Sequence, residues 1–148
     1  MIIDDLQLTG ALQISLNNEI VHQCDNLVVT AGKNWVAGRF KDGSIPDEMS
    51  HMALGDTDTA AAAGNTALAN EITASRIALT TDGGTVSTNT VQYDASWTSS
   101  HGAYVIKEAG IFNHGTSGQG TMLARTTFNV INKGTDDTVS ISWTITVS

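Results

Sequence analysis

The chain has 148 residues, 41% of them apolar and only 15% charged, and its formal net charge is −8 at pH 7. This length predicts one domain, residues 1–148, with a core that needs no disulfide or structural metal. The seven Lys and Arg residues are scattered, which argues against nucleic-acid binding because phosphate neutralisation requires a basic surface. No segment approaches about 18 consecutive apolar residues, so the sequence predicts no membrane span.

The chain opens with alternating apolar and polar residues, the pattern of a strand with one buried face. Residues 6–16 (LQLTGALQISL) follow this pattern, and we take Gly10, which interrupts it, as the mark of a β-bulge. LNNEI then predicts a tight turn into a second strand. Residues 1–5 (MIIDD) are either a short N-terminal arm that adds to a neighbour's sheet edge or simply the start of the first strand.

Two segments depart from the strand pattern. Thr30 can cap a short helix over AGKNWVAGRF, in which Trp35 and Phe40 lie near one face. TALANEIT (residues 66–73) predicts one or two further helical turns. Between them, KDGSIPDEM contains the single proline and predicts a loop.

The stretch HMALGDTDTAAAAGNTAL, residues 51–68, first suggests an acidic metal loop. A calcium loop of the EF-hand type requires glycine at its sixth position and glutamate at its twelfth. Counted from Asp56, these positions hold Ala61 and Ala67, which leaves at most weak surface ion binding at Asp56 and Asp58. We therefore predict no metal site, and we expect HMALG to be a short buried strand, GDTDT a turn and AAAAGNTAL a connector of small residues.

The second half of the chain predicts the remaining strands. RIALTT and TVQYDASWT are strand-like, and VIKEAGIFN and TMLARTTFNVI flank the Gly-rich loop HGTSGQG as a hairpin. TVSISWTITV alternates strictly, with an uncharged Ser and Thr face, and Trp97 and Trp143 fall on buried faces. About seven or eight short strands predict a mainly β protein, an antiparallel β-sandwich of immunoglobulin-like or jelly-roll-like type with one or two short helices.

The candidate reactive groups match no catalytic pattern. Cys24 is alone, the four histidines lack ligand spacing, and the Gly-rich loop has Thr121 where a phosphate loop requires lysine. A Ser–His–Asp triad converges only in space, so sequence order leaves that alternative open. We predict that the protein is not an enzyme and binds no cofactor.

One charged residue lies inside an apolar strand. Glu108 interrupts VIKEAGIFN, and in a hairpin centred near Ser117 it falls opposite residue 125 or 126. Because an unpaired buried charge is costly, we expect a structural ion pair with Arg125, with Arg76 as the second candidate partner.

Several segments of the sequence resemble a known family of proteins. NLVVTAGKNWVAGR, MALGD with AAAGNTAL, and EAGIFN with GTMLAR and the final alternating strand resemble small virion structural proteins of tailed bacteriophages. The resemblance covers residues 26–148, and a looser echo of the hairpin occurs in attachment modules of phage tail fibres. It implies a protein assembled in the host bacterial cytoplasm and located in the virion, without catalytic residues.

The resemblance implies two placements. A capsid decoration (cement) protein would form homo-oligomers, trimers rather than dimers, and bind the major capsid protein. A tail, baseplate or fibre-anchoring protein would bind tail components instead. The sequence ends with a core strand at Ser148 rather than continuing into a shaft, which favours decoration.

Interface anchors would be apolar or aromatic residues outside the core strands, and Trp35, Phe40 and Met49 are the candidates. Trp35 could equally cover an open end of the sandwich. A carbohydrate-binding module is a minor alternative, although burial of Trp97 and Trp143 would leave few aromatic residues for a sugar platform.

Overall fold

The structure is a computed structural model that describes residues 1–2, 5–41, 43–44 and 46–148. Its elements are the strands β1 (Leu8–Leu16) and β2 (Glu19–Val28), the helix α1 (Thr30–Arg39), the strands β3 (His51–Gly55), β4 (Ile77–Ala78), β5 (Thr85–Ser87) and β6 (Thr90–Trp97), the 3₁₀ turn η1 (Ser99–His101), and the strands β7 (Tyr104–Phe112), β8 (Met122–Lys133) and β9 (Val139–Val147).

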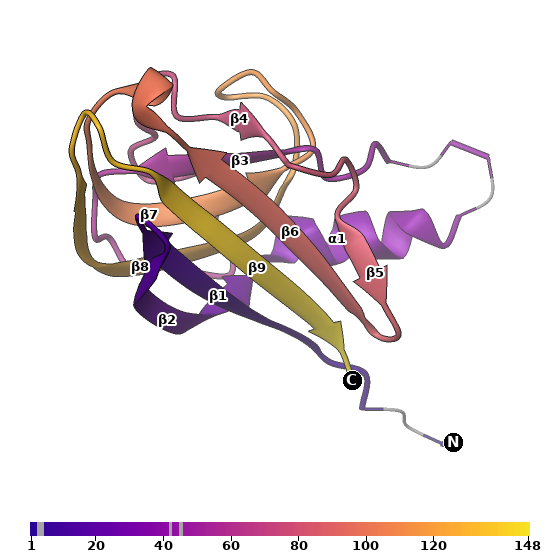
Figure 1. The fold of residues 1–148 in the computed structure, drawn as a ribbon. Coiled ribbons are helices and arrows are strands. Elements are labelled where there is room, and N and C mark those ends of the chain that lie inside the picture. The colour runs from indigo at the N-terminus through magenta and orange to yellow at the C-terminus, as the bar shows by residue number, and fades with distance from the viewer. Residues whose placement is uncertain (3–4, 42, 45) are drawn as a thin grey trace.

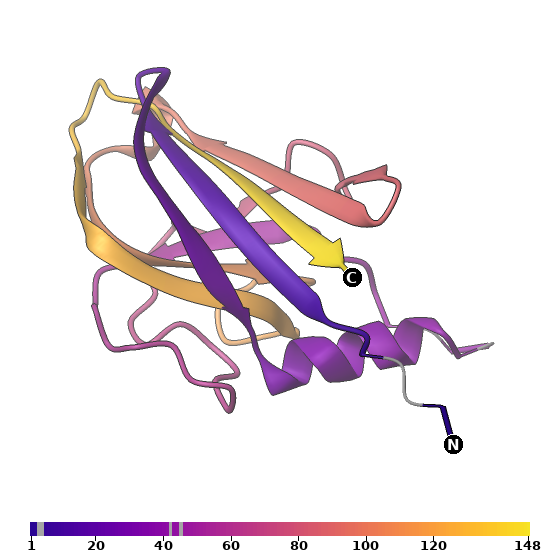
Figure 2. The ribbon, with the colours of Figure 1, turned by 90° about the horizontal axis from the view of Figure 1, so that it is seen from below.

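The nine strands form one curled antiparallel sheet in the order β4-β3-β7-β8-β2-β1-β9-β6-β5 (Figure 1). The prediction of a mainly β, antiparallel sandwich-like fold is confirmed. The two halves of the sheet face one another, and β2 joins them through only two residue pairs, Leu27 with Arg125 and Val28 with Ala124. Beyond these pairs β2 diverges from β8 and runs beside β1 to the turn that connects the two strands (Figure 2).

The core lies between the two halves and contains both predicted tryptophans. Trp97 and Trp143 are fully buried. Their indole nitrogens donate hydrogen bonds of 2.7 Å to the carbonyl of Ser75 and to Oδ1 of Asn26, respectively. Each indole thus buries its polar group with a partner, as a core tryptophan must.

Gly10 does not form the predicted bulge. It is in regular register with both neighbouring strands, and the irregularity in β1 lies between Ile14 and Ser15. A Cβ at position 10 would overlap the Asn26 side chain, the one that accepts the Trp143 hydrogen bond. Glycine at this position therefore leaves room for the Asn26 side chain, which binds the buried Trp143.

The predicted turn at LNNEI is confirmed, and the predicted helical turns at residues 66–73 are wrong. Asn17 and Asn18 both have positive φ, 50° and 68°, as a two-residue hairpin turn requires. Residues 66–73 contain bends, the start of a turn and one isolated bridge but no helix. The amides of Ala69 and Asn70 bind the carboxylate of Glu108, which replaces the hydrogen bonds that a helix would use.

The helix predicted after Thr30 is present, but Thr30 is not its cap. The capping position is Val29, with no side-chain hydrogen bond, and the Thr30 amide donates to the carbonyl of Ala63. The helix approaches β8 so closely at Gly32 that a Cβ there would overlap the backbone of Leu123. Within the described part of the chain, α1 and every other helical segment are too short or too polar to cross a membrane.

We predict that Gly32→Ala destabilises the protein although alanine is the better helix former. Helix propensity alone predicts a gain of about 1 kcal/mol, whereas overpacking against a fixed backbone costs about 1–3 kcal/mol. The measurement is urea unfolding followed by circular dichroism. Asn34→Ala, at an exposed position of the same helix, is the control and should change the unfolding free energy by less than about 0.5 kcal/mol. A Gly32→Ala protein as stable as the wild type would contradict the close packing.

Candidate functional site

The most distinctive polar feature of the described residues is a buried ion pair in the β7–β8 hairpin. Glu108 and Arg125 are 0% and 1% exposed, and Nη2 and Nε of Arg125 lie 2.7 and 2.8 Å from Oε2 of Glu108. The predicted pair is confirmed. The predicted register, with residue 125 or 126 opposite Glu108, is wrong by one or two residues, because a shift between Ile111 and Phe112 places Glu108 opposite Thr127. The two charged residues are consequently diagonal neighbours on one face of the hairpin.

The ion pair also binds the connector that follows β3, residues 56–70. Arg125 donates from Nη1 and Nη2 to backbone carbonyls at one end of this connector, and the two oxygens of Glu108 accept from backbone amides at the other end. The partners are the carbonyls of Thr59 (2.6 Å) and Ala60 (3.2 Å), Oδ1 of Asn65 (3.0 Å), and the amides of Ala69 (3.1 Å) and Asn70 (2.9 Å). Both charged side chains therefore use their hydrogen-bonding groups to position the backbone of the connector.

Gly55 completes the packing around the carboxylate. It lies opposite Glu108 in the pairing of β3 with β7, and a Cβ there would overlap the Glu108 side chain. The glycine of MALGD thus provides the space in which Glu108 crosses toward the connector.

A second arginine organises the Gly-rich loop between β7 and β8. Arg76 was the second candidate partner of Glu108, and it pairs with Glu71 instead, at 2.7 Å. Its guanidinium stacks over the Phe112 ring at 3.7 Å from the ring centroid, and Nη1 donates to three loop carbonyls, those of His114, Thr116 and Gln119. No sequence spacing marks this contact, because its partners lie up to 43 residues away along the chain.

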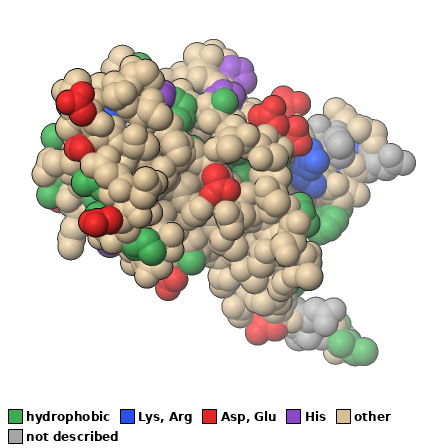
Figure 3. Space-filling model, viewed as in Figure 1, with side chains coloured by type: hydrophobic (Ala, Val, Ile, Leu, Met, Phe, Trp, Pro, Cys, Tyr) green, Lys and Arg blue, Asp and Glu red, His purple; other side chains and the backbone are tan. Residues whose placement is uncertain are grey.

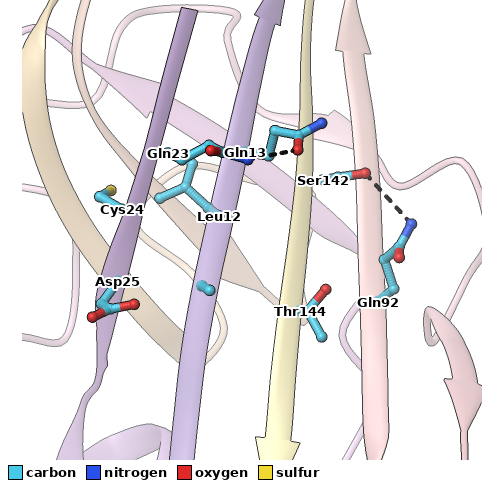
Figure 4. A pocket seen from close by; sticks show the side chains of 9 residues that line it. Leu12, Gln13, Gln23, Cys24, Asp25, Gln92, Ser142 and Thr144 are labelled. Atoms are coloured by element: carbon cyan, nitrogen blue, oxygen red, sulfur yellow. Dashed lines mark hydrogen bonds between the residues drawn. The ribbon is translucent and has the colours of Figure 1, made fainter. Parts of the chain in front are cut away.

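The outer face of the sheet around β1, β9 and β6 is polar and nearly uncharged. It has a shallow depression of about 690 Å³ whose lining includes Gln13, Gln23, Gln92 and Ser142 (Figure 4). These groups bind one another: Gln23 donates to Gln13 at 3.0 Å, and Gln92 donates to Ser142 at 3.4 Å and to the Asp94 carboxylate. Such a face can form hydrogen bonds with a polar partner surface.

The three candidate interface anchors have different environments. Phe40 is 81% exposed. Trp35 is half-buried against the core, and its indole nitrogen donates to the carbonyl of Asp47 at 2.7 Å. Met49 is fully buried, so predicting it as an interface anchor was wrong. Met49 is buried because the chain is already hydrogen-bonded to the sheet at the next residue, where the Ser50 amide donates to the carbonyl of Phe112.

The described residues contain no group of three or more His, Cys, Asp or Glu side chains that could hold a metal ion. At the acidic stretch, Oδ1 of Asp56 accepts a 2.6 Å hydrogen bond from Asn70. Burial raises the pKa of the Cys24 thiol, which lies 3.7 Å from the Thr126 hydroxyl. A raised pKa disfavours the thiolate, the reactive form of cysteine.

Comparison with known proteins adds no further information. A scan against protein-family models, a search of curated proteins and a search of solved structures each found no match.

We predict that Glu108→Ala and Arg125→Ala each lower the unfolding free energy by about 3–5 kcal/mol, because each leaves a buried charge without its partner. The double variant Glu108→Leu with Arg125→Met should lose less than the sum of the two single changes. Urea unfolding measures these values, with Glu19→Ala at an exposed position as the control. A Glu108→Ala protein with an unchanged unfolding midpoint would contradict the role of the pair.

We predict that His51 makes stability depend on pH. Burial, together with the positive charge of Arg76, lowers the pKa of this histidine below its usual 6.5. The fold therefore favours the neutral ring: the contribution is complete above about pH 6.5 and is lost as the pH falls from there through the folded-state pKa. Unfolding measured between about pH 7.5 and 5 should depend less on pH in His51→Gln, whereas Thr80→Ala, at an exposed position that leaves the histidine and its Ser50 hydrogen bond intact, should behave as the wild type. Equal pH dependence in His51→Gln would contradict this assignment.

Proposed function

We propose that the protein is a structural component of a tailed-phage virion, and specifically a capsid decoration protein that binds the shell and stabilises contacts between major capsid proteins. The observation that supports this proposal is the meeting of the two most specific segments of the resemblance. These two segments are far apart in sequence: the first contains MALGD and AAAGNTAL, and the second contains EAGIFN and GTMLAR. The Glu108–Arg125 pair of the second segment forms hydrogen bonds with the first. The residues that carry the resemblance therefore hold the backbone of the connector against the β7–β8 hairpin.

The connector presents a surface suited to contact with another protein. Ala60, Ala62, Ala63 and Gly64 are exposed, while Asn65 and the two charged residues bind the segment from beneath. Small side chains allow close approach of a partner, and a loop held in place loses little conformational entropy on binding. Repetition of a modest contact by symmetry makes the total attachment strong.

A tail or baseplate accessory protein is the second candidate. The β7–β8 hairpin, which contains EAGIFN and GTMLAR, is the part of the chain with an echo in attachment modules of tail fibres. A carbohydrate-binding module has less support. Trp97 and Trp143 are buried, and among the aromatic side chains of the described residues Phe40 alone is exposed.

The proposal predicts hundreds of copies on each particle of the phage that encodes the chain. Particles would be purified, heads separated from tails, and the protein quantified by mass spectrometry against the major capsid protein. Shells stripped of the protein should lose integrity at a lower temperature and regain it when the protein is added back. Recovery only with tails, at a dozen copies or fewer, would support the second candidate, and absence from particles would exclude both.

A matched pair of variants tests the connector itself. Ala62→Glu introduces a charge on the exposed connector and should retain the fold but bind stripped shells at least tenfold more weakly. Ala78→Glu, at an exposed position of β4, is the control and should bind as the wild type. Equal binding by Ala62→Glu would place the shell contact elsewhere on the protein.

A further inference from the structure

The exposed positive charge of this acidic protein is concentrated on and beside α1. All seven Lys and Arg residues are described, and Arg76, Arg125 and Lys133 are occupied by internal hydrogen bonds. Lys107 is half-buried, whereas the three remaining cations, Lys33, Arg39 and Lys41, are exposed on or directly after the helix. Figure 3 shows blue side chains gathered at the end of the molecule where the helix terminates.

Exposed apolar side chains lie beside these cations. Phe40 is 81% exposed and Leu6 67%, and they line a groove of about 480 Å³ together with Val36 and Lys33. We call Leu6, Lys33, Val36, Phe40 and Lys41 the helix surface. It combines apolar area with positive charge.

The opposite end of the β1–β2 hairpin has the complementary composition. Ile20, Val21 and Val130 are 57%, 45% and 49% exposed, and the latter two line a cavity of about 360 Å³ where β2 has left β8. The β8–β9 loop is hydrogen-bonded to the β1–β2 turn, and these hydrogen bonds bring the exposed Asp136 to the same end of the molecule as the exposed Glu19. We call Glu19, Ile20, Val21, Val130 and Asp136 the turn surface.

A third carboxylate, that of Asp137, lies beside this surface. Hydrogen bonds from the Asn17 side chain and the Gly134 amide lower the pKa of Asp137, the residue that connects the loop to the turn. Asp136 is its neighbour in the same loop, and Glu19 follows the turn by one residue. The turn surface is thus apolar with an acidic border.

The two surfaces cannot meet within one molecule. They lie at opposite ends of β1, whose nine residues span about 26 Å. Figure 2 shows the hairpin extending between the helix end and the turn end. Any contact between them must therefore involve two copies of the chain.

We propose that copies of this protein associate head-to-tail, with the helix surface of one copy packed on the turn surface of the next. Apolar groups meet apolar groups, and Lys33 and Lys41 approach Glu19 and Asp136. A contact between two different surfaces is heterologous, so it generates a ring when the rotation between copies closes and a filament when it does not. The proposal concerns the purified protein and does not depend on its place in a virion.

Two variants, each with one surface altered, test this proposal by sedimentation velocity at about 10–100 µM protein. The wild type should form assemblies larger than dimers that weaken at high salt, since exposed charges are screened. Phe40→Asp and Val21→Asp should each be monomeric, with unchanged circular dichroism. Val86→Asp, at a 69% exposed position outside both surfaces, is the control and should assemble as the wild type.

Mixing the two variants gives the decisive measurement. Each retains one intact surface, so an equimolar mixture should form dimers that contain one copy of each variant and nothing larger. A monomeric wild type would overturn the proposal, and so would assembly by either variant alone. A mixture that stays monomeric would also overturn it, because the intact helix surface of one variant would then have failed to bind the intact turn surface of the other. None of these outcomes bears on the copy number in particles, so failure here is distinguishable from failure of the proposed function.

Discussion

The structure depends on one buried ion pair between neighbouring strands. Burying Glu108 and Arg125 removes both from water, a cost that their mutual attraction offsets only when the remaining hydrogen-bonding groups also find partners. Here those partners are backbone carbonyls and amides at the two ends of a connector with little apolar side chain of its own. The pair therefore determines the path of a segment that could not bury enough surface to order itself.

Arg76 repeats this arrangement at the other end of the same hairpin. It pairs with Glu71, stacks on Phe112 and binds three carbonyls of the Gly-rich loop. In both places an arginine, with several donors in a planar group, satisfies backbone acceptors that a loop rich in small residues leaves without partners. Loops that resemble flexible ligand sites in sequence are thus positioned parts of the scaffold.

This use of arginine has a consequence for the outer surface. Because cations are few and three of them point inward, the exterior is acidic except near α1, where apolar side chains are also exposed. On the polar, uncharged face of β9, Ser140 and Ser142 form hydrogen bonds with side chains of the neighbouring strand β6. Surface charge and exposed apolar area are therefore distributed unevenly over the molecule.

The sequence by itself determined every strand except β5, the tight turn, the short helix, the burial of Trp97 and Trp143, and the Glu108–Arg125 pair, because alternation and the cost of a buried charge are local properties of the chain. Tertiary structure alone decided the rest: the bulge that shifted the hairpin register, the Glu108 carboxylate that prevents a helix at residues 66–73, the burial of Met49, and the contacts of Arg76. These features depend on partners distant in sequence, and no local pattern identifies such partners.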